Sequence, residues 1–498
     1  MKNRYITAAA CLALCLLTEG SLLHAQTGSM NYIKTIELMT PVTNPDAIIS
    51  IPDVSNAKRT TVAYFDGLGR PIQEVTVAKS PGYKDIVQHI EYDDYGRSPL
   101  QYLPYTATSL AGGYHSASLN KLQQFYSGNT QGIPGTSVYY AETDYEPSPL
   151  NRVMHTASPG EAWALGNGHA VGYEYGANES DEVILFQEIN NEIINSGYYD
   201  PGKLYKNTTT DEDGNISITC TDFENRQILK RNVTDEGNFD TYYVYNDLGL
   251  LAHVIMPEYF ATFNNLDLHS FGYAYDARKR MIRKKIPGAE AVYYVYNKAD
   301  LPVFEQDGNL RERGAWRFYK YDGLGRMVLT GIYDNPAGQS ELQNQVDMHE
   351  GIHFEERNSD DYRSNFGYSC RALPTDRYIV KEVMYYDNYD FLPDGQSALT
   401  AYFLSDPATP AANPNVKTMQ TGKRAFTEEQ EMEEWLDVMF YDERYRMIQS
   451  VTVNDARRHR YYTFNTYSFS GQLTQSKNYL NNGNTGLISY TFDYSYDH

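Results

Sequence analysis

A short phrase of aromatic, acidic and glycine residues recurs along this chain, and it constrains the fold more than any other feature of the sequence. "AYFDGLGRPI" begins at position 63, "IEYDDYGRSP" at 90, "YVYNDLGLLA" at 243 and "YKYDGLGRMV" at 319. Further copies begin at 273, 294 and 439, and residues 494–498 read "YSYDH". A catalytic loop is normally present once, whereas a recurring phrase indicates a building unit that stacks on its neighbours.

The chemistry of the phrase predicts a strand, a tight turn and a second strand. Tyr-x-Tyr alternates with period two, so both rings lie on one face of a strand. Asp or Asn fits the first turn position, and Gly three residues later accepts the positive φ that closes the hairpin. The predicted turn residues are Asp66, Gly69, Arg70, Asp93, Gly96, Arg97, Asn246, Gly249, Asp276, Asp322, Gly325 and Arg326.

Two finer expectations follow for the turns. Where another residue replaces Gly, as Lys279 and Tyr445 do, we expect a looser turn, because side chains disfavour positive φ. The arginine that follows the turn, for example Arg70 or Arg326, could bind an acidic partner. The simpler interpretation is that it faces the tyrosines of the partner strand, where it stacks on a ring or pairs with a nearby carboxylate.

This pattern resembles the YD repeat of Rhs-type proteins, the bacterial relatives of the teneurin shell. The stretch from "NYIKTIELMTPVTNPD" to "YDDYGRSPLQYLPY" is similar to the N-terminal domain of unknown function that heads many secreted Rhs proteins. The resemblance implies a mainly β fold, in which YD-repeat hairpins wind into a continuous, curved, shell-like sheet with a few short helices in insertions. In complete members of the family, the shell often encloses a C-terminal toxic domain.

The chain also departs from this family. Complete members carry a self-cleaving core segment after the repeats, and no such segment is found here. Residues 494–498 form the first half of a unit without its return strand. We therefore expect an incomplete, truncated shell with an open sheet edge that aggregates or dimerises, and cargo, cleavage and toxicity are not carried over.

The organisation along the chain is read from the repeats and from shifts in composition. We expect a helix in "SASLNKLQQFYSG" at 116–128 and another in "TEEQEMEEWLDVM" at 427–439, while 336–351 and 406–417 read as loops. The predicted segments are a signal peptide (1–25), the N-terminal domain of unknown function with two YD-like units (26–150), a YD-repeat sheet (151–335), an insertion with loops and a short helix (336–437) and further repeats (438–498).

The N-terminus predicts where the protein is located, and the net charge disfavours two classes of partner. Lys2 and Arg4, the apolar run "ITAAACLALCLL" and a small-residue site after Ala25 predict a cleaved signal peptide, so we expect the periplasm, the outer surface or the medium. No later run of 18 apolar residues predicts a transmembrane segment. The net charge of −22 at pH 7 disfavours nucleic acid and anionic lipid as partners. Cys220 and Cys370 could pair, but two cysteines do not make a disulfide framework.

Motifs that would carry chemistry are weak by comparison. "DEDGN" at 211–215 lacks the Gly and Glu that an EF-hand needs at its sixth and twelfth positions, and a hairpin turn explains it better than calcium. The histidines show no metal-binding spacing, and no nucleophile elbow, phosphate loop or dinucleotide fingerprint occurs. No two carboxylates stand out as a pair for glycoside hydrolysis. We therefore predict no catalytic residue, no metal and no cofactor.

The leading interpretation is non-enzymatic. The sequence predicts a secreted YD-repeat scaffold, the N-terminal part of an Rhs-type shell, with a C-terminal effector or the remaining repeats as its partner. The alternative is a cell-surface carbohydrate-binding or adhesion module that uses aromatic patches to contact a glycan or a protein. A third hypothesis is a glycan-degrading enzyme hidden in the β architecture.

Overall fold

The protein is described from a computed structural model of the 498-residue chain. The structure describes residues 30–40, 47–128, 132–189, 192–262, 265–358, 366–392, 402–404, 410–427, 434–454, 459–481 and 487–496. The chain divides into two compact units, residues 1–170 and residues 171–498. The predicted signal peptide, residues 1–25, lies outside the described residues and stays a prediction.

The first unit contains two antiparallel groups of strands. Its larger sheet has the order β1-β2-β3-β4-β6, and β7 lies between β5 and β8 in the smaller group. The elements are β1 (Asn31–Leu38), α1 (Ala47–Ser50), β2 (Lys58–Phe65), β3 (Pro71–Thr76), β4 (Asp85–His89), β5 (Leu100–Tyr102), β6 (Tyr105–Ala107), α2 (Ser118–Tyr126), β7 (Tyr140–Tyr145), β8 (Val153–Ala157) and the 3₁₀ helix η1 (Glu161–Trp163).

The second unit contains one long antiparallel sheet and a separate hairpin. Its strands are β9 (Val171–Ala177), β10 (Ile184–Ile189), β11 (Glu192–Tyr198), β12 (Tyr205–Thr210), β13 (Ile216–Thr221), β14 (Gln227–Thr234), β15 (Gly237–Tyr245), β16 (Leu251–Ile255), β17 (Ser270–Tyr275), β18 (Met281–Lys285), β19 (Val292–Tyr296), β20 (Pro302–Gln306), β21 (Ala315–Tyr321), β22 (Met327–Asp334), β23 (Tyr378–Asp387), β24 (Val416–Phe426), β25 (Glu434–Tyr441), β26 (Met447–Asn454), β27 (His459–Tyr467), β28 (Leu473–Asn481) and β29 (Leu487–Asp493).

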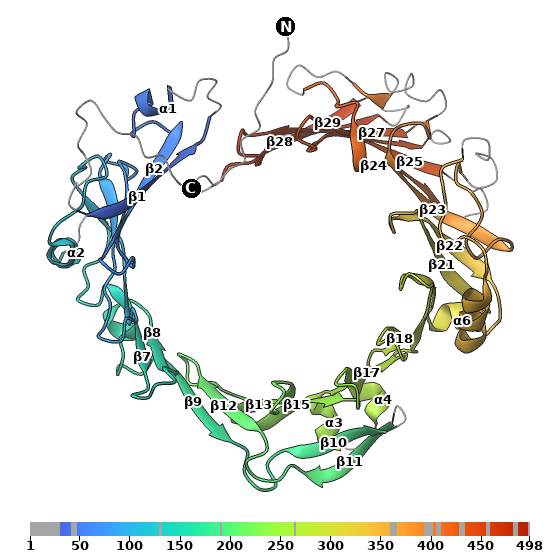
Figure 1. Ribbon diagram of the computed structural model, residues 1–498, viewed down its shortest axis with the longest axis horizontal. Coiled ribbons are helices and arrows are strands. Elements are labelled where there is room, and N and C mark those ends of the chain that lie inside the picture. Colours follow the sequence, from blue (N-terminus) through green and yellow to red (C-terminus); the bar gives the residue numbers. More distant parts are fainter. Residues whose placement is uncertain are drawn as a thin grey trace. The chain divides into compact units, whose positions relative to one another are not determined.

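Strand order in this sheet follows chain order, and Figure 1 shows the strands succeeding one another along a curved surface. β9 pairs with β12, and from β12 to β29 each strand pairs with the next one in an antiparallel register. The hairpin β10–β11 stands apart from this ladder. Within the described residues of this unit, β9 and β29 have one strand partner each, so its sheet is open. The predicted mainly β fold with a continuous curved sheet is confirmed.

The core follows from the period-two pattern of the strands. In β25 the alternate residues Leu436, Val438 and Phe440 are buried, and they join a cluster that extends to Phe304 and Phe318. Separate clusters lie under β14–β16 and inside the first unit. Burial of one strand face excludes a shift of register by one residue, because such a shift would expose every buried side chain.

The helices agree with the sequence at one place and differ from it at two. The helix predicted at 116–128 is present as α2. The segment 336–351, predicted as a loop, contains α6 (Gln339–Met348), whose Leu342 and Val346 are buried. The helix predicted at 427–439 is wrong where the structure describes it, because β25 begins at Glu434 and its alternating apolar residues enter the sheet. The remaining helices are α3 (Pro257–Thr262), α4 (Leu266–His269) and α5 (Gly308–Glu312).

Two further expectations concern the thiols and the membrane. Cys220 and Cys370 are both free thiols, and burial raises the pKa of Cys220 to about 11. No helix in the described part of the chain combines the length and apolar character that a membrane crossing requires.

Candidate functional site

Each repeat ends its first strand in the same tight turn, and residues 66–70 show its geometry. The backbone N–H of Asp66 donates to the carbonyl of Arg70 at 2.9 Å, and the N–H of Gly69 donates to the carbonyl of Asp66 at 3.1 Å. Oδ1 of Asp66 accepts from the N–H groups of Leu68 and Arg70, both at 2.9 Å. Oδ2 accepts from Arg70 Nε at 2.8 Å. One carboxylate therefore closes the turn and orients the arginine beside it.

The same arrangement recurs along the chain. Five further turns carry the Asp–Arg pair with an Nε–Oδ2 distance of 2.7 or 2.8 Å. They begin at Asp93, Asp222, Asp276, Asp322 and Asp442 and end at Arg97, Arg226, Arg280, Arg326 and Arg446. The turns that begin at Asn246 and Asn297 keep the bonds to the backbone but end in leucine. The structure places all twelve predicted turn residues in these turns.

The fourth turn position adopts the left-handed conformation whatever residue occupies it. The glycines at 69, 96, 249 and 325 have φ between +73° and +79°. Lys279 (φ +65°) and Tyr445 (φ +60°) donate the same N–H to the aspartate carbonyl, at 2.9 and 3.0 Å. The prediction of a looser turn at these positions is therefore wrong. The aspartate bonds offset the cost of left-handed backbone in a residue with a side chain, about 1–2 kcal/mol.

Each turn also contacts the repeat that follows it. The guanidinium carbon of Arg280 lies 4.8 Å from the ring centroid of Tyr296, which belongs to the next repeat. The Tyr296 hydroxyl donates to the carbonyl of Met281, the residue directly after Arg280, at 2.7 Å. The following tyrosine thus covers the arginine and bonds the strand that the arginine begins.

This contact between repeats is general. Arginine lies over the next tyrosine ring at 4.3–5.3 Å in Arg70–Tyr92, Arg97–Tyr145, Arg226–Tyr245, Arg326–Tyr386 and Arg446–Tyr467. The hydroxyl of the next tyrosine also donates to the carbonyl directly after the preceding turn at Tyr92, Tyr245, Tyr386 and Tyr467. Tyr275, Tyr321 and Tyr496 donate in the same way after turns that do not end in arginine. The predicted stacking and pairing are confirmed, but the ring comes from the following repeat and not from the partner strand of the same hairpin.

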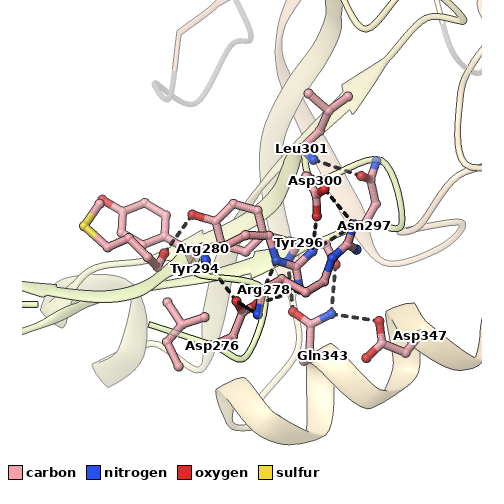
Figure 2. A network of polar contacts seen from close by, with 12 residues as sticks. Asp276, Arg278, Arg280, Tyr294, Tyr296, Asn297, Asp300, Leu301, Gln343 and Asp347 are labelled. Atoms are coloured by element: carbon pink, nitrogen blue, oxygen red, sulfur yellow. Dashed lines mark hydrogen bonds and ion pairs between the residues drawn. The ribbon is translucent and has the colours of Figure 1, made fainter. Parts of the chain in front are cut away.

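Figure 2 shows two successive turns joined by polar contacts. Arg280 Nη1 donates to the carbonyl of Asn297 at 3.1 Å and to Oδ1 of Asp300 at 3.0 Å. Arg278 donates to the other Asp300 oxygen at 2.7 Å. The carboxylate of Asp300 in the second turn therefore neutralises charge on the two arginines of the first turn. These arginines have protein partners without any ligand.

Helix α6 completes this network beside a short strand pairing. β18 and β19 share two residue pairs, so several backbone groups of β19 have no strand partner there. The side-chain amide of Gln343 accepts from the N–H of Tyr296 at 3.0 Å and donates to its carbonyl at 2.8 Å. Gln339 donates to the carbonyls of Ile282 and Tyr294. The two glutamines of α6 thus replace missing ladder bonds, and Figure 2 shows Gln343 on the helix beside Tyr296.

The electrostatics of the turns favour the charged carboxylates. The backbone and side-chain hydrogen bonds from Arg70 hold the pKa of Asp66 below its usual range. Burial opposes the charged form of Asp276, yet the hydrogen bonds from Arg280 outweigh it, and the pKa of this carboxyl is also lowered. The turns are therefore ion-paired at neutral pH.

The candidate calcium loop is a turn of the same kind. Asp211 Oδ1 accepts from the N–H groups of Asp213 and Asn215, and Oδ2 accepts from the Asn215 side chain at 2.9 Å. The hairpin interpretation of this segment is confirmed. Over the described ranges, the structure brings together no group of three His, Cys, Asp or Glu side chains that could hold a metal ion.

Two of the Asp–Arg turns were not among the turn residues predicted from the sequence. Asp222 and Arg226 form a complete turn in "TDFENRQ", but no Tyr-x-Tyr precedes them. The turn that begins at Asp442 lies in a recognised copy whose turn residues were not singled out. The spacing of an acid and an arginine four residues apart, followed by a strand, is the signal that finds both.

Comparison with known proteins gives one family match. Residues 34–177 match the family described as "Domain of unknown function (DUF6443)". The match confirms that the N-terminal part of the chain contains a domain of unknown function, and it covers less than half of the chain. No curated protein matches the sequence.

Several solved structures resemble the chain at a distance. The crystal structure of TcdB2-TccC3 is 12% identical, with a TM-score of 0.42, over 86% of this chain and 19% of that one. For the crystal structure of TcdB2-TccC3-TEV the values are 12%, 0.43, 86% and 19%. For a Photorhabdus luminescens Tc holotoxin pore they are 12%, 0.42, 87% and 19%. The chain therefore spans about a fifth of the length of the solved chains it matches.

Proposed function

We propose that this chain is a secreted, non-enzymatic YD-repeat scaffold, the N-terminal part of an Rhs-type shell that encloses or presents a C-terminal effector. The observation that carries the proposal is the contact between each turn and the tyrosine of the next repeat, from Arg70–Tyr92 to Arg446–Tyr467. In this contact, the aspartates, arginines and tyrosines of the repeats bind one another and join neighbouring strands. The DUF6443 match, over the residues that resemble the N-terminal domain of secreted Rhs proteins, is the second support.

The enclosing role is tested on the secreted product in its natural source. The product is purified with an antibody against this chain and digested with a non-specific protease, before and after unfolding in urea. We expect a second polypeptide, continuous with this chain or bound to it, that survives digestion of the folded product and is degraded after urea. A secreted product without such a polypeptide would contradict the proposal, as would polysaccharide turnover abolished by a single Asp or Glu substitution.

Export is tested separately. The signal peptide requires that the exported chain begin at Gln26, after cleavage at Ala25. N-terminal sequencing of the product in the periplasm or medium checks this expectation. A full-length chain beginning at Met1 and retained in the cytoplasm would contradict it, while leaving the scaffold proposal to its own test.

The second candidate function is carbohydrate binding at the cell surface. A cavity of about 410 Å³ beside the turn of residues 322–326 favours it, because aromatic and charged side chains meet there. The contacts between repeats do not explain this cavity, because they form at the other turns in the same way.

A further inference from the structure

A cavity in the second unit lies beside the turn that begins at Asp322. It measures about 410 Å³, within the usual range of small-ligand sites. The turn forms one wall, and the segment of residues 354–357 forms another, together with Tyr368, Tyr386 and Asp387. Bridges between Asp322 and Glu355 and between Arg357 and Tyr368 fix that segment against the sheet.

The carboxylates around the cavity are neutralised by partners of their own. Arg326 pairs with Asp322 at 2.7 Å and with Asp387 at 2.6 Å. Glu355 is fully buried and pairs with Lys320 at 2.9 Å. These three carboxylates therefore leave lone pairs for hydrogen bonds but little net charge for a cation.

The fourth carboxylate belongs to Glu356, and Arg371 neutralises it at 2.7 Å. Each acid of the lining thus has a cation within ion-pair distance. The cavity is consequently a poor site for a divalent metal and a poor match for a cationic ligand.

Arg357 is different from these residues. Its side chain is exposed, and among the described residues no carboxylate lies within ion-pair distance of it. The guanidinium carbon lies 4.9 Å from the ring centroid of Tyr368 and 5.0 Å from the ring centroid of Tyr385. Two rings therefore hold a cation whose remaining donors can bind a carboxylate in a bidentate manner.

Apolar surface lies next to this cation. Phe354 is 36% exposed and Leu324 is 74% exposed, and both line the cavity. A Cβ at Gly323 would lie 3.6 Å from the Phe354 ring, so the glycine leaves that part of the ring uncovered. The negative face of such a ring attracts the weakly positive C–H bonds of a sugar ring.

We propose that this cavity binds a uronic acid residue of an acidic polysaccharide. The sugar carboxylate pairs with Arg357, the C–H face of the sugar packs on Phe354, and its hydroxyls donate to the oxygens of Asp387 and Glu356. A phosphate fits less well, because it has no C–H face to pack on Phe354 and no sugar hydroxyls to donate to the carboxylate oxygens. The inference deepens the carbohydrate-binding alternative and is independent of the shell proposal.

The test is isothermal titration calorimetry on the full chain. The probes are trigalacturonate, a hyaluronan tetrasaccharide, the carboxyl-reduced neutral form of trigalacturonate and a tri-glutamate peptide. We expect saturable binding of at least one uronate and at least about tenfold weaker binding of the neutral form, as loss of a charge-assisted hydrogen bond predicts. Absence of saturable uronate binding, or equal binding of the peptide, would overturn the proposal.

Variants separate the site from non-specific charge effects. Arg357→Gln is expected to weaken uronate binding by about tenfold or more, whereas Arg357→Lys retains part of the binding. Arg444→Gln is the matched control, because Arg444 is also exposed and stacks on a ring, that of Phe469 at 5.1 Å, outside the cavity lining. Circular dichroism verifies folding of each variant. Unchanged binding by folded Arg357→Gln would refute the assignment.

Discussion

At the scale of single residues, the aspartate of the turn both accepts hydrogen bonds from the turn backbone and pairs with the arginine, whereas asparagine makes only the backbone bonds. Asn246 and Asn297 bond the backbone of their turns as Asp66 does, but leucine replaces the arginine that would need a charged partner. Because these ion pairs are partly exposed, their charge attraction is worth little by itself. The tyrosine hydroxyl and ring that cover the arginine make the stronger link between repeats.

Removal of one such hydroxyl tests this ranking. Tyr296→Phe loses the hydrogen bond to Met281 and keeps the ring under Arg280, so we expect unfolding free energy to fall by about 1 kcal/mol. Tyr293→Phe is the control, since the Tyr293 hydroxyl makes no hydrogen bond among the described residues. Urea denaturation of the three chains measures the difference. Equal losses in the two variants would show that the bond contributes nothing.

The pH dependence of one turn follows from the lowered pKa of Glu146. Hydrogen bonds from Arg152, supported by Ser148, lower this pKa from 4.5 to about 2. The stabilisation is therefore complete above pH 4.5 and is lost as pH falls toward about 2. Glu146→Gln is expected to flatten the stability profile of the first unit in this window, whereas Glu236→Gln, at an exposed hairpin turn, leaves it unchanged. A profile identical to the parent's in Glu146→Gln would contradict the assignment.

At the scale of elements, helix α6 supplies hydrogen bonds that the sheet lacks. Gln343→Ala leaves the N–H and carbonyl of Tyr296 without this partner, and we expect a loss of about 1–3 kcal/mol. Gln345→Ala on the exposed side of the same helix is the control for helix propensity. Thermal unfolding compares the two variants. A loss no larger than in the control would show that water replaces the Gln343 amide.

The sequence predicted the hairpins well because their signals are local. Asp276 and Gly325 lie in the expected turns, since turn chemistry is decided within five residues. Prediction failed where tertiary context decides. The glutamates near 434 favour a helix, but Leu436 and Phe440 gain more by entering the sheet as β25. The cavity beside Arg357 was not predictable, because its walls come from residues separated along the chain by tens of positions.

At the scale of the whole molecule, β29 is an edge strand, with one strand partner among the described residues of the second unit. β29 pairs with β28 on one side, and Ile488 and Phe492 are each 52% exposed. Such an edge offers unpaired backbone groups to another strand. We therefore expect the chain to associate as its concentration rises in sedimentation experiments.

Matched charge substitutions identify the surface responsible. Ile488→Lys is expected to shift the chain toward the monomer, because a charged edge opposes strand pairing. Leu248→Lys adds the same charge at an exposed turn, 53% accessible, and is expected to leave association unchanged. A parent chain that stays monomeric and protease-resistant at high concentration would contradict this prediction.

The contacts between turn and tyrosine join successive repeats of the second unit into one cooperative sheet. Native-state hydrogen exchange tests this cooperativity most directly. We expect the amides at the fourth turn position, among them those of Lys279 and Gly325, to be protected as strongly as the strands beside them. We also expect the repeats from β14 to β28 to open together. Fast exchange at these turn amides, with each hairpin opening at its own rate, would contradict it.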